Sequence, residues 1–210
     1  TRQLVTLTSC SSSFSNKTRT IKFWSTYTNP ASGTLQGAVA AGTGNADCAT
    51  GYSALSTSSA TPTSLALSFN NGASPQSTFS LCYPDVGDVR IDARYDGSAA
   101  TGDAGVVILG NDSFIAKPDR FEVGSIRRTS DNLSNPATTP TPANPENDTK
   151  FVTAGVSSSA SSQFTATITA KNALGATTPN YGLESTPEGV VLTAVLVAPA
   201  GGNTGTLTCK

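Results

Sequence analysis

Alternation of apolar and polar residues is the clearest pattern in this chain, and it predicts β-strands. The pattern is sharpest over 88–95, where Val, Ile, Ala and Tyr alternate with charged residues. Such alternation indicates an antiparallel strand with one buried face and one face in water. A turn at 84–87 precedes it, because Pro84 presets φ and Gly87 allows a positive φ. Further strands are predicted at 77–83 and 106–116.

The same pattern predicts strands along the whole chain, and helical periodicity is missing over any useful length. They are expected at 1–8, 18–28, 34–42, 64–69, 121–127, 164–171, 190–197 and 206–209. In the strand at 18–28, Ile21, Phe23 and Ser25 share one face. The segment 190–197 is apolar on both faces, which predicts a central, doubly covered strand. Short strands at this spacing are typical of a β-sandwich, so the predicted fold class is all-β.

Strand count and composition divide the chain into two tandem immunoglobulin-like β-sandwich modules. The first covers 1–118, and its turn and strand at 83–95 are typical of the E–F corner of such folds. The second covers 119–210 and contains a Pro-rich stretch at about 130–148, which predicts an extended loop or arm. Whether this arm docks on the surface or is a mobile insertion stays open.

The second module is predicted to be short or incomplete, because a full immunoglobulin-like sandwich needs about seven strands. Three explanations stay open: the chain is a fragment of a longer protein, the second sheet is small, or a neighbouring subunit supplies a strand. The last is donor-strand complementation, in which a foreign strand fills an open sheet edge. Its natural donor is the segment 1–8, with Leu4, Val5 and Leu7 as apolar positions.

Composition narrows the class of protein. The 210 residues carry 13 Lys and Arg against 14 Asp and Glu, a net charge of −1. Without a basic excess, nucleic acid is not expected as a partner. The longest apolar runs fall short of the ~18 residues of a membrane helix, so membrane insertion is not expected either. No signal peptide precedes Thr1, so we expect that processing removed it or that the sequence is a piece of something longer.

Four cysteines without a Cys-x-x-Cys spacing favour an oxidising compartment over a metal site. Cys48 and Cys82 both lie in the first module, and we expect them to pair. Cys10 and Cys209 lie near the two ends of the chain. The sequence does not decide whether they pair with each other or with cysteines of neighbouring subunits. The predicted location is extracellular.

Catalysis is not expected. The chain has no histidine, the usual base beside a nucleophile, and no motif sets two carboxylates across a cleft. No cofactor is predicted. Calcium is the one cofactor that the sequence suggests, because five carboxylates cluster in it: Asp85, Asp88, Asp92, Asp96 and Asp103. Asp88 and Asp92 alternate with arginines on the predicted wet face, where cross-strand ion pairs are the simpler explanation.

An aromatic platform for a carbohydrate is the alternative function. Its candidates are Trp24, Tyr27 and Tyr52. A single tryptophan is more often an anchor in or beside the hydrophobic core than a sugar-binding platform, and we expect Trp24 to be such an anchor.

Three long motifs connect the chain to a known family. They are YPDVGDVRIDARYDGSAATGDAG with NDSFIAKPDRF, the upstream FWSTYTNPASGT, and NALGATTPNYGLESTPEGVVLTAVLVAPAGG. Taken in chain order, they resemble the C-terminal modules of the MshQ family, whose members are encoded with MSHA-type and other type IV pili. The resemblance implies extracellular β-sandwich modules and carries over no catalytic residue. MshQ-like sequences often have Cys where this chain has Ser25, so a local bridge from Cys10 is in doubt.

The expected function is that of a structural or adhesive extracellular module in a pilus-associated or surface-filament protein. Under the donor-strand hypothesis, such modules would also polymerise. Its expected partners are other copies of itself or neighbouring modules. Host or surface glycans are the partners under the carbohydrate-binding alternative.

Overall fold

A computed structural model describes residues 14–31, 38–43, 51–134, 152, 162–193 and 195 of the chain. Every named element in this part is a β-strand, which confirms the all-β prediction. The chain divides into two compact units. Unit 1 comprises Thr1–Pro118 and Thr178–Pro187, and unit 2 comprises Asp119–Thr177 and Glu188–Lys210.

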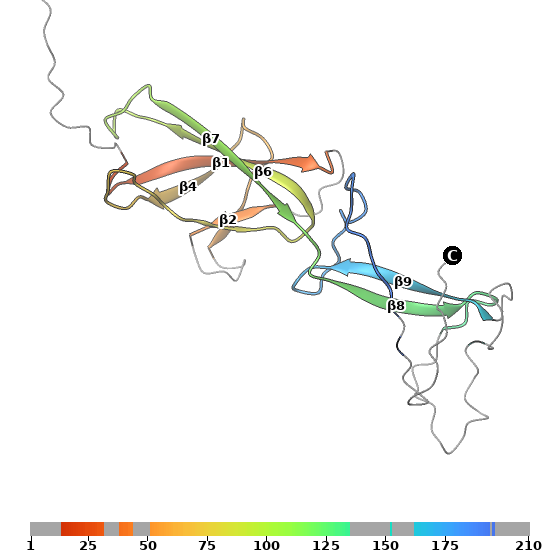
Figure 1. The fold of residues 1–210 in the computed structure, drawn as a ribbon. Coiled ribbons are helices and arrows are strands. Elements are labelled where there is room, and N and C mark those ends of the chain that lie inside the picture. Colours follow the sequence, from red (N-terminus) through yellow and green to blue (C-terminus); the bar gives the residue numbers. More distant parts are fainter. Residues whose placement is uncertain are drawn as a thin grey trace, which may run out of the picture. The chain divides into compact units, whose positions relative to one another are not determined.

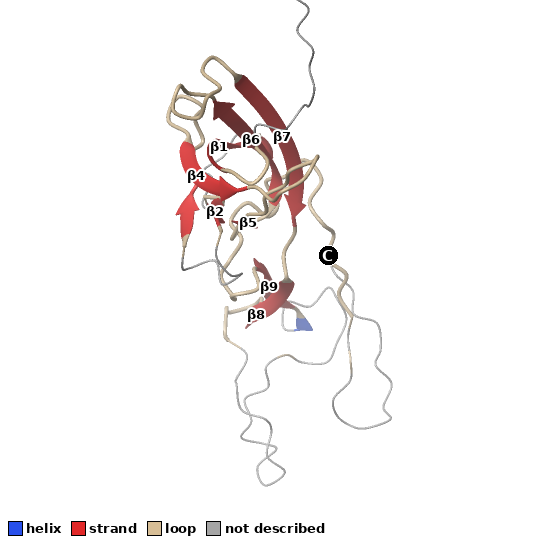
Figure 2. Cartoon of the chain, turned by 90° about the vertical axis from the view of Figure 1, so that its left-hand side faces the viewer, coloured by secondary structure: helices blue, strands red, loops and turns tan. Residues whose placement is uncertain are grey.

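Unit 1 is an immunoglobulin-like sandwich of two antiparallel sheets (Figure 1). Its described strands are β1 (Thr18–Asn29), β2 (Ala40–Gly42), β3 (Tyr52–Ala54), β4 (Thr63–Ser68), β5 (Ser80–Cys82), β6 (Gly87–Asp96) and β7 (Val107–Ala116). Sheet A has the order β4-β1-β6-β7, and sheet B has the order β3-β2-β5. Figure 2 shows β7 beside β6 at one edge of sheet A.

The core of unit 1 lies between the two sheets and follows the predicted alternation. In β1, Ile21, Phe23 and Ser25 are buried. In β6, Val89 and Ile91 point to the same interior, because successive side chains of a strand alternate between its faces. The buried core cluster consists of Ile21, Phe23, Val39, Ala41, Leu55, Leu67, Val89, Ile91 and Tyr95.

The opposite face of β6 carries ion pairs, but Asp92 pairs within its own strand and not across strands as predicted. Asp96 accepts from Lys22 on β1 and from Arg94 on its own strand, both at 2.7 Å. Arg90 lies 3.1 Å from Asp92. These cationic side chains are more than a third exposed, so each pair contributes little to stability, and together they keep this face polar.

The described part of unit 2 holds a smaller sheet. It pairs β8 (Arg120–Arg128) with β9 (Phe164–Lys171), and the register shifts between Gly124 and Arg127. At the irregularity Ser125 takes a positive φ of 49°. The predicted strand and turn at 164–175 are confirmed, since β9 is followed by a turn with Gly175 at φ 80°.

The prediction of a central strand over 190–197 is wrong for the residues that are described there. Val190 to Thr193 form no strand, and Val191 and Val195 are 88% and 82% exposed. An apolar run alone does not define a strand, because the run must also find neighbours on both sides. The predicted strands at 1–8 and 206–209 and residues 135–148 of the Pro-rich region lie outside the described residues.

No helix in the described residues is long and apolar enough to cross a membrane.

Candidate functional site

The edge strand β7 is the most unusual surface of unit 1. Within the described structure it pairs with β6 alone, which leaves its other edge free. Large apolar side chains on and just before it are exposed: Val106 42%, Val107 53%, Ile108 47%, Leu109 69% and Ile115 69%. Natural sheets usually protect such edges with charge, proline or a covering segment. Among the described residues this edge is apolar and uncovered, a combination that is frequent at protein–protein contact surfaces.

The strand presents apolar groups on both of its faces. Residues opposite each other in a ladder share a face, so Ile108, opposite Tyr95, points inward. Leu109 lies opposite Arg94, so it points outward beside the ion pairs of β6. We call Val107, Leu109 and Ile115 the outer apolar face of β7. An apolar stripe next to a charged stripe has the composition of a protein–protein interface core with its polar rim.

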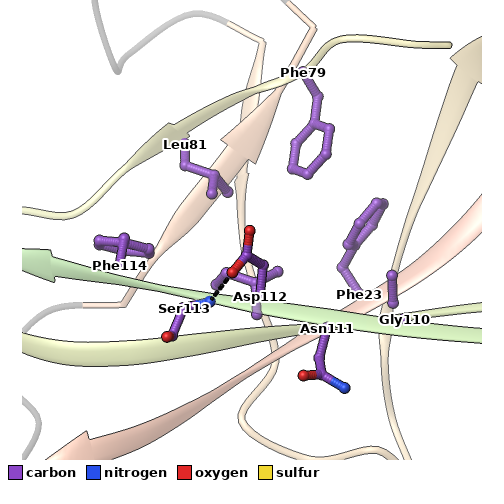
Figure 3. Close-up of a pocket in the computed structure, with 10 residues that line it drawn as sticks. Phe23, Phe79, Leu81, Gly110, Asn111, Asp112, Ser113 and Phe114 are labelled. Atoms are coloured by element: carbon purple, nitrogen blue, oxygen red, sulfur yellow. Dashed lines mark hydrogen bonds between the residues drawn. The ribbon is translucent and has the colours of Figure 1, made fainter.

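The inner face of β7 opens into a groove of roughly 400 Å³ between the two sheets (Figure 3). Its lining comes from β1, β6, β7 and the stretch through β5: Phe23, Phe79, Leu81, Ile91, Ala93, Gly110, Asn111, Asp112, Ser113 and Phe114. Leu81 on β5 and Phe79 just before that strand face β7 across this space. Because β5 pairs with β2 only among the described strands, the groove lies between two free sheet edges.

The groove exists because β7 leaves its inner positions underfilled. A Cβ atom added at Gly110 would meet nothing within 4 Å. The next inward position is Asp112, whose carboxylate accepts a 2.9 Å hydrogen bond from the Ser113 N–H. The rings of Phe23 and Phe79, 4.8 Å apart, contribute to the lining of this space. The groove therefore reaches the margin of the core, although Phe23 and Ile91 in its lining are themselves buried.

A second feature of unit 1 is a buried polar corner at the turn before β6. The Tyr83 hydroxyl donates to the Val86 carbonyl at 3.2 Å and accepts from the Asn180 side-chain amide at 3.1 Å. The Asp85 carboxylate accepts from the backbone N–H groups of Val86 and Asn180. Burial raises the pKa of Tyr83 above its usual range, and the nearby Asp85 charge adds to the rise. The hydroxyl therefore stays protonated and remains a donor at ordinary pH.

The corner fixes a distant part of the chain to unit 1. Asn180 is fully buried and lies 95 residues from Asp85 in sequence. Asn29 adds two hydrogen bonds to the same segment, both with Ser185. The side-chain oxygens Asp85 Oδ2, Thr178 Oγ1 and Asn180 Oδ1 are buried without a hydrogen-bond partner. The segment 178–187 is thus held mainly by polar contacts.

The aspartates weighed as calcium ligands have separate roles. Asp92 and Asp96 form the ion pairs of β6. Hydrogen bonds from Thr101 and Tyr95 lower the pKa of Asp103 to about 2. Within the described residues, no group of three or more His, Cys, Asp or Glu side chains is placed to hold a metal ion.

The three aromatic residues considered for carbohydrate binding, Trp24, Tyr27 and Tyr52, do not form one surface. Trp24 lies opposite Asp92 and points outward, whereas Tyr27 lies opposite Val89 and points inward. Tyr27 packs against the ring of Tyr83 at 5.9 Å, and burial raises its pKa. Tyr52 lies on β3 in sheet B, and its hydroxyl is buried without a partner. All three side chains are half-buried.

Of the four cysteines, the described structure includes Cys82, which is disulfide-bonded. Cys10, Cys48 and Cys209 lie outside the described residues, as do the proposed donor positions Leu4, Val5 and Leu7. The pairing of Cys48 with Cys82 stays a prediction.

The sequence reasoning missed the groove and the outer apolar face. The sequence feature that could have indicated this surface is the run Val106–Leu109. It lies at the start of a predicted strand and is apolar throughout, without alternation. Such a run implies apolar groups on both faces, but it does not tell a central strand from an edge strand.

Comparison with known families gives two matches. Residues 2–111 match a family described as "Domain of unknown function (DUF6701), first Ig-like domain". Residues 117–210 match "DUF6701, second domain". No curated protein and no solved structure shows significant similarity to the chain.

Proposed function

The chain belongs to the DUF6701 family, with its first immunoglobulin-like domain followed by its second domain, and from this premise we propose that it is a structural module of an extracellular surface filament or pilus-associated protein. Its work is mechanical: it spaces or joins neighbouring modules. The resemblance of three long motifs to the MshQ family supports the association with pili.

The observation that carries the proposal is the outer apolar face of β7. Val107, Leu109 and Ile115 are each more than half exposed on an edge strand. Beside them lies the ion-paired face of β6, which includes Arg94 and Asp96. This surface suits a second folded module, because a flat apolar stripe with a polar border buries area well and holds no small molecule. We propose that a neighbouring module or a second copy of the chain docks on it.

A carbohydrate-binding role is not favoured by the geometry. Stacking on a sugar needs exposed aromatic faces presented together, and Trp24 and Tyr27 point to opposite sides of sheet A. We therefore make protein–protein association the proposed role.

Location tests the proposal first. Antibodies against the folded protein are applied to intact cells of the source organism, with immunogold labelling and fractionation of surface filaments. We expect label on the surface and the protein in the filament fraction. Protein confined to the cell interior would refute the extracellular role.

Association tests the interface. Light scattering after size-exclusion chromatography compares the unchanged chain with Leu109→Asn/Ile115→Asn and with a matched control, Leu174→Asn. Leu174 is 88% exposed in a turn of unit 2, so the control removes an exposed leucine elsewhere. We expect the double substitution alone to reduce self-association at high concentration or binding to isolated filaments. Equal behaviour of both variants would exclude β7 as the contact.

A further inference from the structure

Three buried oxygen atoms at the polar corner of unit 1 have no hydrogen-bond partner. They are Asp85 Oδ2, Thr178 Oγ1 and Asn180 Oδ1, and the three residues are 4%, 3% and 0% exposed. Native proteins seldom bury polar atoms in this way, because such an atom loses its hydration and gains nothing in return. Since all three atoms are oxygens, the corner lacks a partner that binds oxygen.

The three atoms belong to one small region. Thr178 and Asn180 lie in a single turn, which is closed by a 3.1 Å hydrogen bond from the Tyr181 N–H to the Thr178 carbonyl. Asp85 contacts the same turn, since its Oδ1 accepts from the Asn180 N–H at 3.1 Å. The second oxygen of that carboxylate is left over beside the turn. A carboxylate, a hydroxyl and an amide oxygen are thus brought together.

The corner also carries negative charge without a balancing cation. The ion pairs of the described residues use other carboxylates: Asp92, Asp96, Asp119, Glu122 and Asp131. Burial is the main cause of the raised pKa of Tyr83, and the charges of Asp85 and Glu184 add to it, so both carboxylates lie near this hydroxyl. Buried charges in proteins are usually paired or coordinate a metal ion.

We propose that this corner binds a Ca²⁺ ion, with Asp85 Oδ2, Thr178 Oγ1 and Asn180 Oδ1 as protein ligands and Glu184 as a second nearby charge. Ca²⁺ takes oxygen ligands from carboxylates, amide carbonyls and water, and it accepts flexible geometry. Mg²⁺ suits the corner less well, because it demands near-ideal octahedral coordination and loses its water reluctantly. Of the five aspartates that suggest calcium in the sequence, this site uses Asp85 alone.

The site differs from a cluster of acidic side chains. The described residues contain no group of three or more His, Cys, Asp or Glu side chains that could hold a metal ion. Here two carboxylates are completed by an amide and a hydroxyl from a turn that is distant in sequence. A bound ion therefore links the turn before β6 to the segment 178–187, which raises the stability of unit 1 in proportion to the Ca²⁺ concentration.

Thermal melting of the full chain tests the proposal. The single tryptophan lies in β1, so its fluorescence reports the melting of unit 1. Extracellular calcium modules have dissociation constants of roughly 0.1–1 mM, so melts with EDTA are compared with melts in about 10 mM CaCl₂ or MgCl₂. We expect Ca²⁺ to raise the melting temperature by roughly 4 °C or more, and Mg²⁺ to raise it less.

Matched aspartate variants locate the effect. Asp85→Asn keeps an oxygen that accepts from the Val86 and Asn180 N–H groups but removes the charge. Asp112→Asn makes the same change at an exposed position of β7 in the same unit. We expect Asp85→Asn to lose the rise caused by Ca²⁺ and Asp112→Asn to retain it.

A third variant keeps the test decisive if Asp85→Asn does not fold. Thr178→Val has nearly the same shape and removes only a hydroxyl oxygen that has no partner. In EDTA we expect it to melt at the temperature of the unchanged chain or above. With Ca²⁺ we expect a smaller rise, because one ligand is missing. An undiminished rise in this variant would overturn the assigned ligand set.

Calorimetric titration of the chain with CaCl₂ measures binding directly. We expect a single ion per chain in the unchanged protein and in Asp112→Asn, and none in Asp85→Asn. If the unchanged protein neither binds Ca²⁺ nor gains stability from it, the corner holds water only and the proposal is wrong. Equal binding by Asp85→Asn would place the ion elsewhere and overturn it as well. All of these measurements use purified protein, so the proposed function in surface filaments stands or falls separately.

Discussion

The hydroxyl of Tyr83 offers the sharpest test of how unit 1 is stabilised. Tyr83→Phe retains the ring, which packs 5.9 Å from Tyr27 and 6.2 Å from Phe114. It removes the donor to the Val86 carbonyl and the acceptor of the Asn180 amide. The substitution therefore isolates two buried hydrogen bonds from the packing around them.

The expected cost follows from the burial of the two partners. Val86 and Asn180 are both fully buried, so neither finds water when the hydroxyl is removed. An orphaned buried polar group costs about 1–3 kcal/mol, and with partial relaxation we expect a total of about 2–4 kcal/mol. For a domain of this size that is a fall in melting temperature of roughly 6–20 °C.

Tyr52→Phe is the matched control, because the Tyr52 hydroxyl is buried without a hydrogen-bond partner. Its removal is expected to be neutral or slightly stabilising, since a desolvated and unpaired group is lost. Urea denaturation followed by the fluorescence of Trp24 in β1 measures both variants in unit 1. If Tyr83→Phe costs no more than Tyr52→Phe, the corner does not contribute as described.

Three further predictions concern the backbone at Gly87, the loss of stability at low pH and the disulfide bond of Cys82. Gly87 has φ 131°, and an added Cβ would lie 2.5 Å from the Asn29 carbonyl oxygen, so Gly87→Ala should cost more than about 2 kcal/mol. Gly72→Ala in the same unit, where an added Cβ would meet only the Ser74 nitrogen at 3.9 Å, should cost less than about 1 kcal/mol in the same denaturation assay. Asp103 has its pKa lowered to about 2 from 3.8, so the ionised side chain stabilises the fold above pH 4, and this contribution is lost as pH falls toward 2. Asp103→Asn should therefore flatten the fall in melting temperature between pH 4 and 2, and an unchanged profile would show that other groups control it. Cys82→Ser should lower the stability of unit 1 by about 2–4 kcal/mol, and peptide mapping of the oxidised protein identifies the bonded partner.

The elements that could be predicted from the sequence were those in which a local pattern already reports burial. Residues 88–95 alternate without a slip, and so do the residues around Phe23 in β1. Both strands were placed correctly, with the correct faces, because a period of two survives in any antiparallel sheet with one wet side. The run 190–197 carried no such signal, since an apolar stretch without alternation fits a strand, another buried segment or an exposed one.

The candidate site depends on tertiary relations that no local pattern contains. Whether Leu109 is central or exposed depends on whether a strand lies beside β7, and that is a property of topology. The groove depends on the absence of a side chain at Gly110, and its facing wall includes Phe79, which lies just before β5 and is distant in sequence. The contact between Asp85 and Asn180 spans 95 residues, and neither residue alone indicates the other.

The segment Thr178–Pro187 has a consequence for how the protein matures. It belongs to the compact unit formed by Thr1–Pro118, although the 59 residues of Asp119–Thr177 separate them in the chain. During synthesis the residues of Thr1–Pro118 are therefore made before Asn180 is available, and until then the Tyr83 hydroxyl and the Asp85 carboxylate lack their contacts to it. The last hydrogen bonds of the first unit can form only after Asp119–Thr177 has been synthesised, so folding of this unit ends late although its strands come early in the chain.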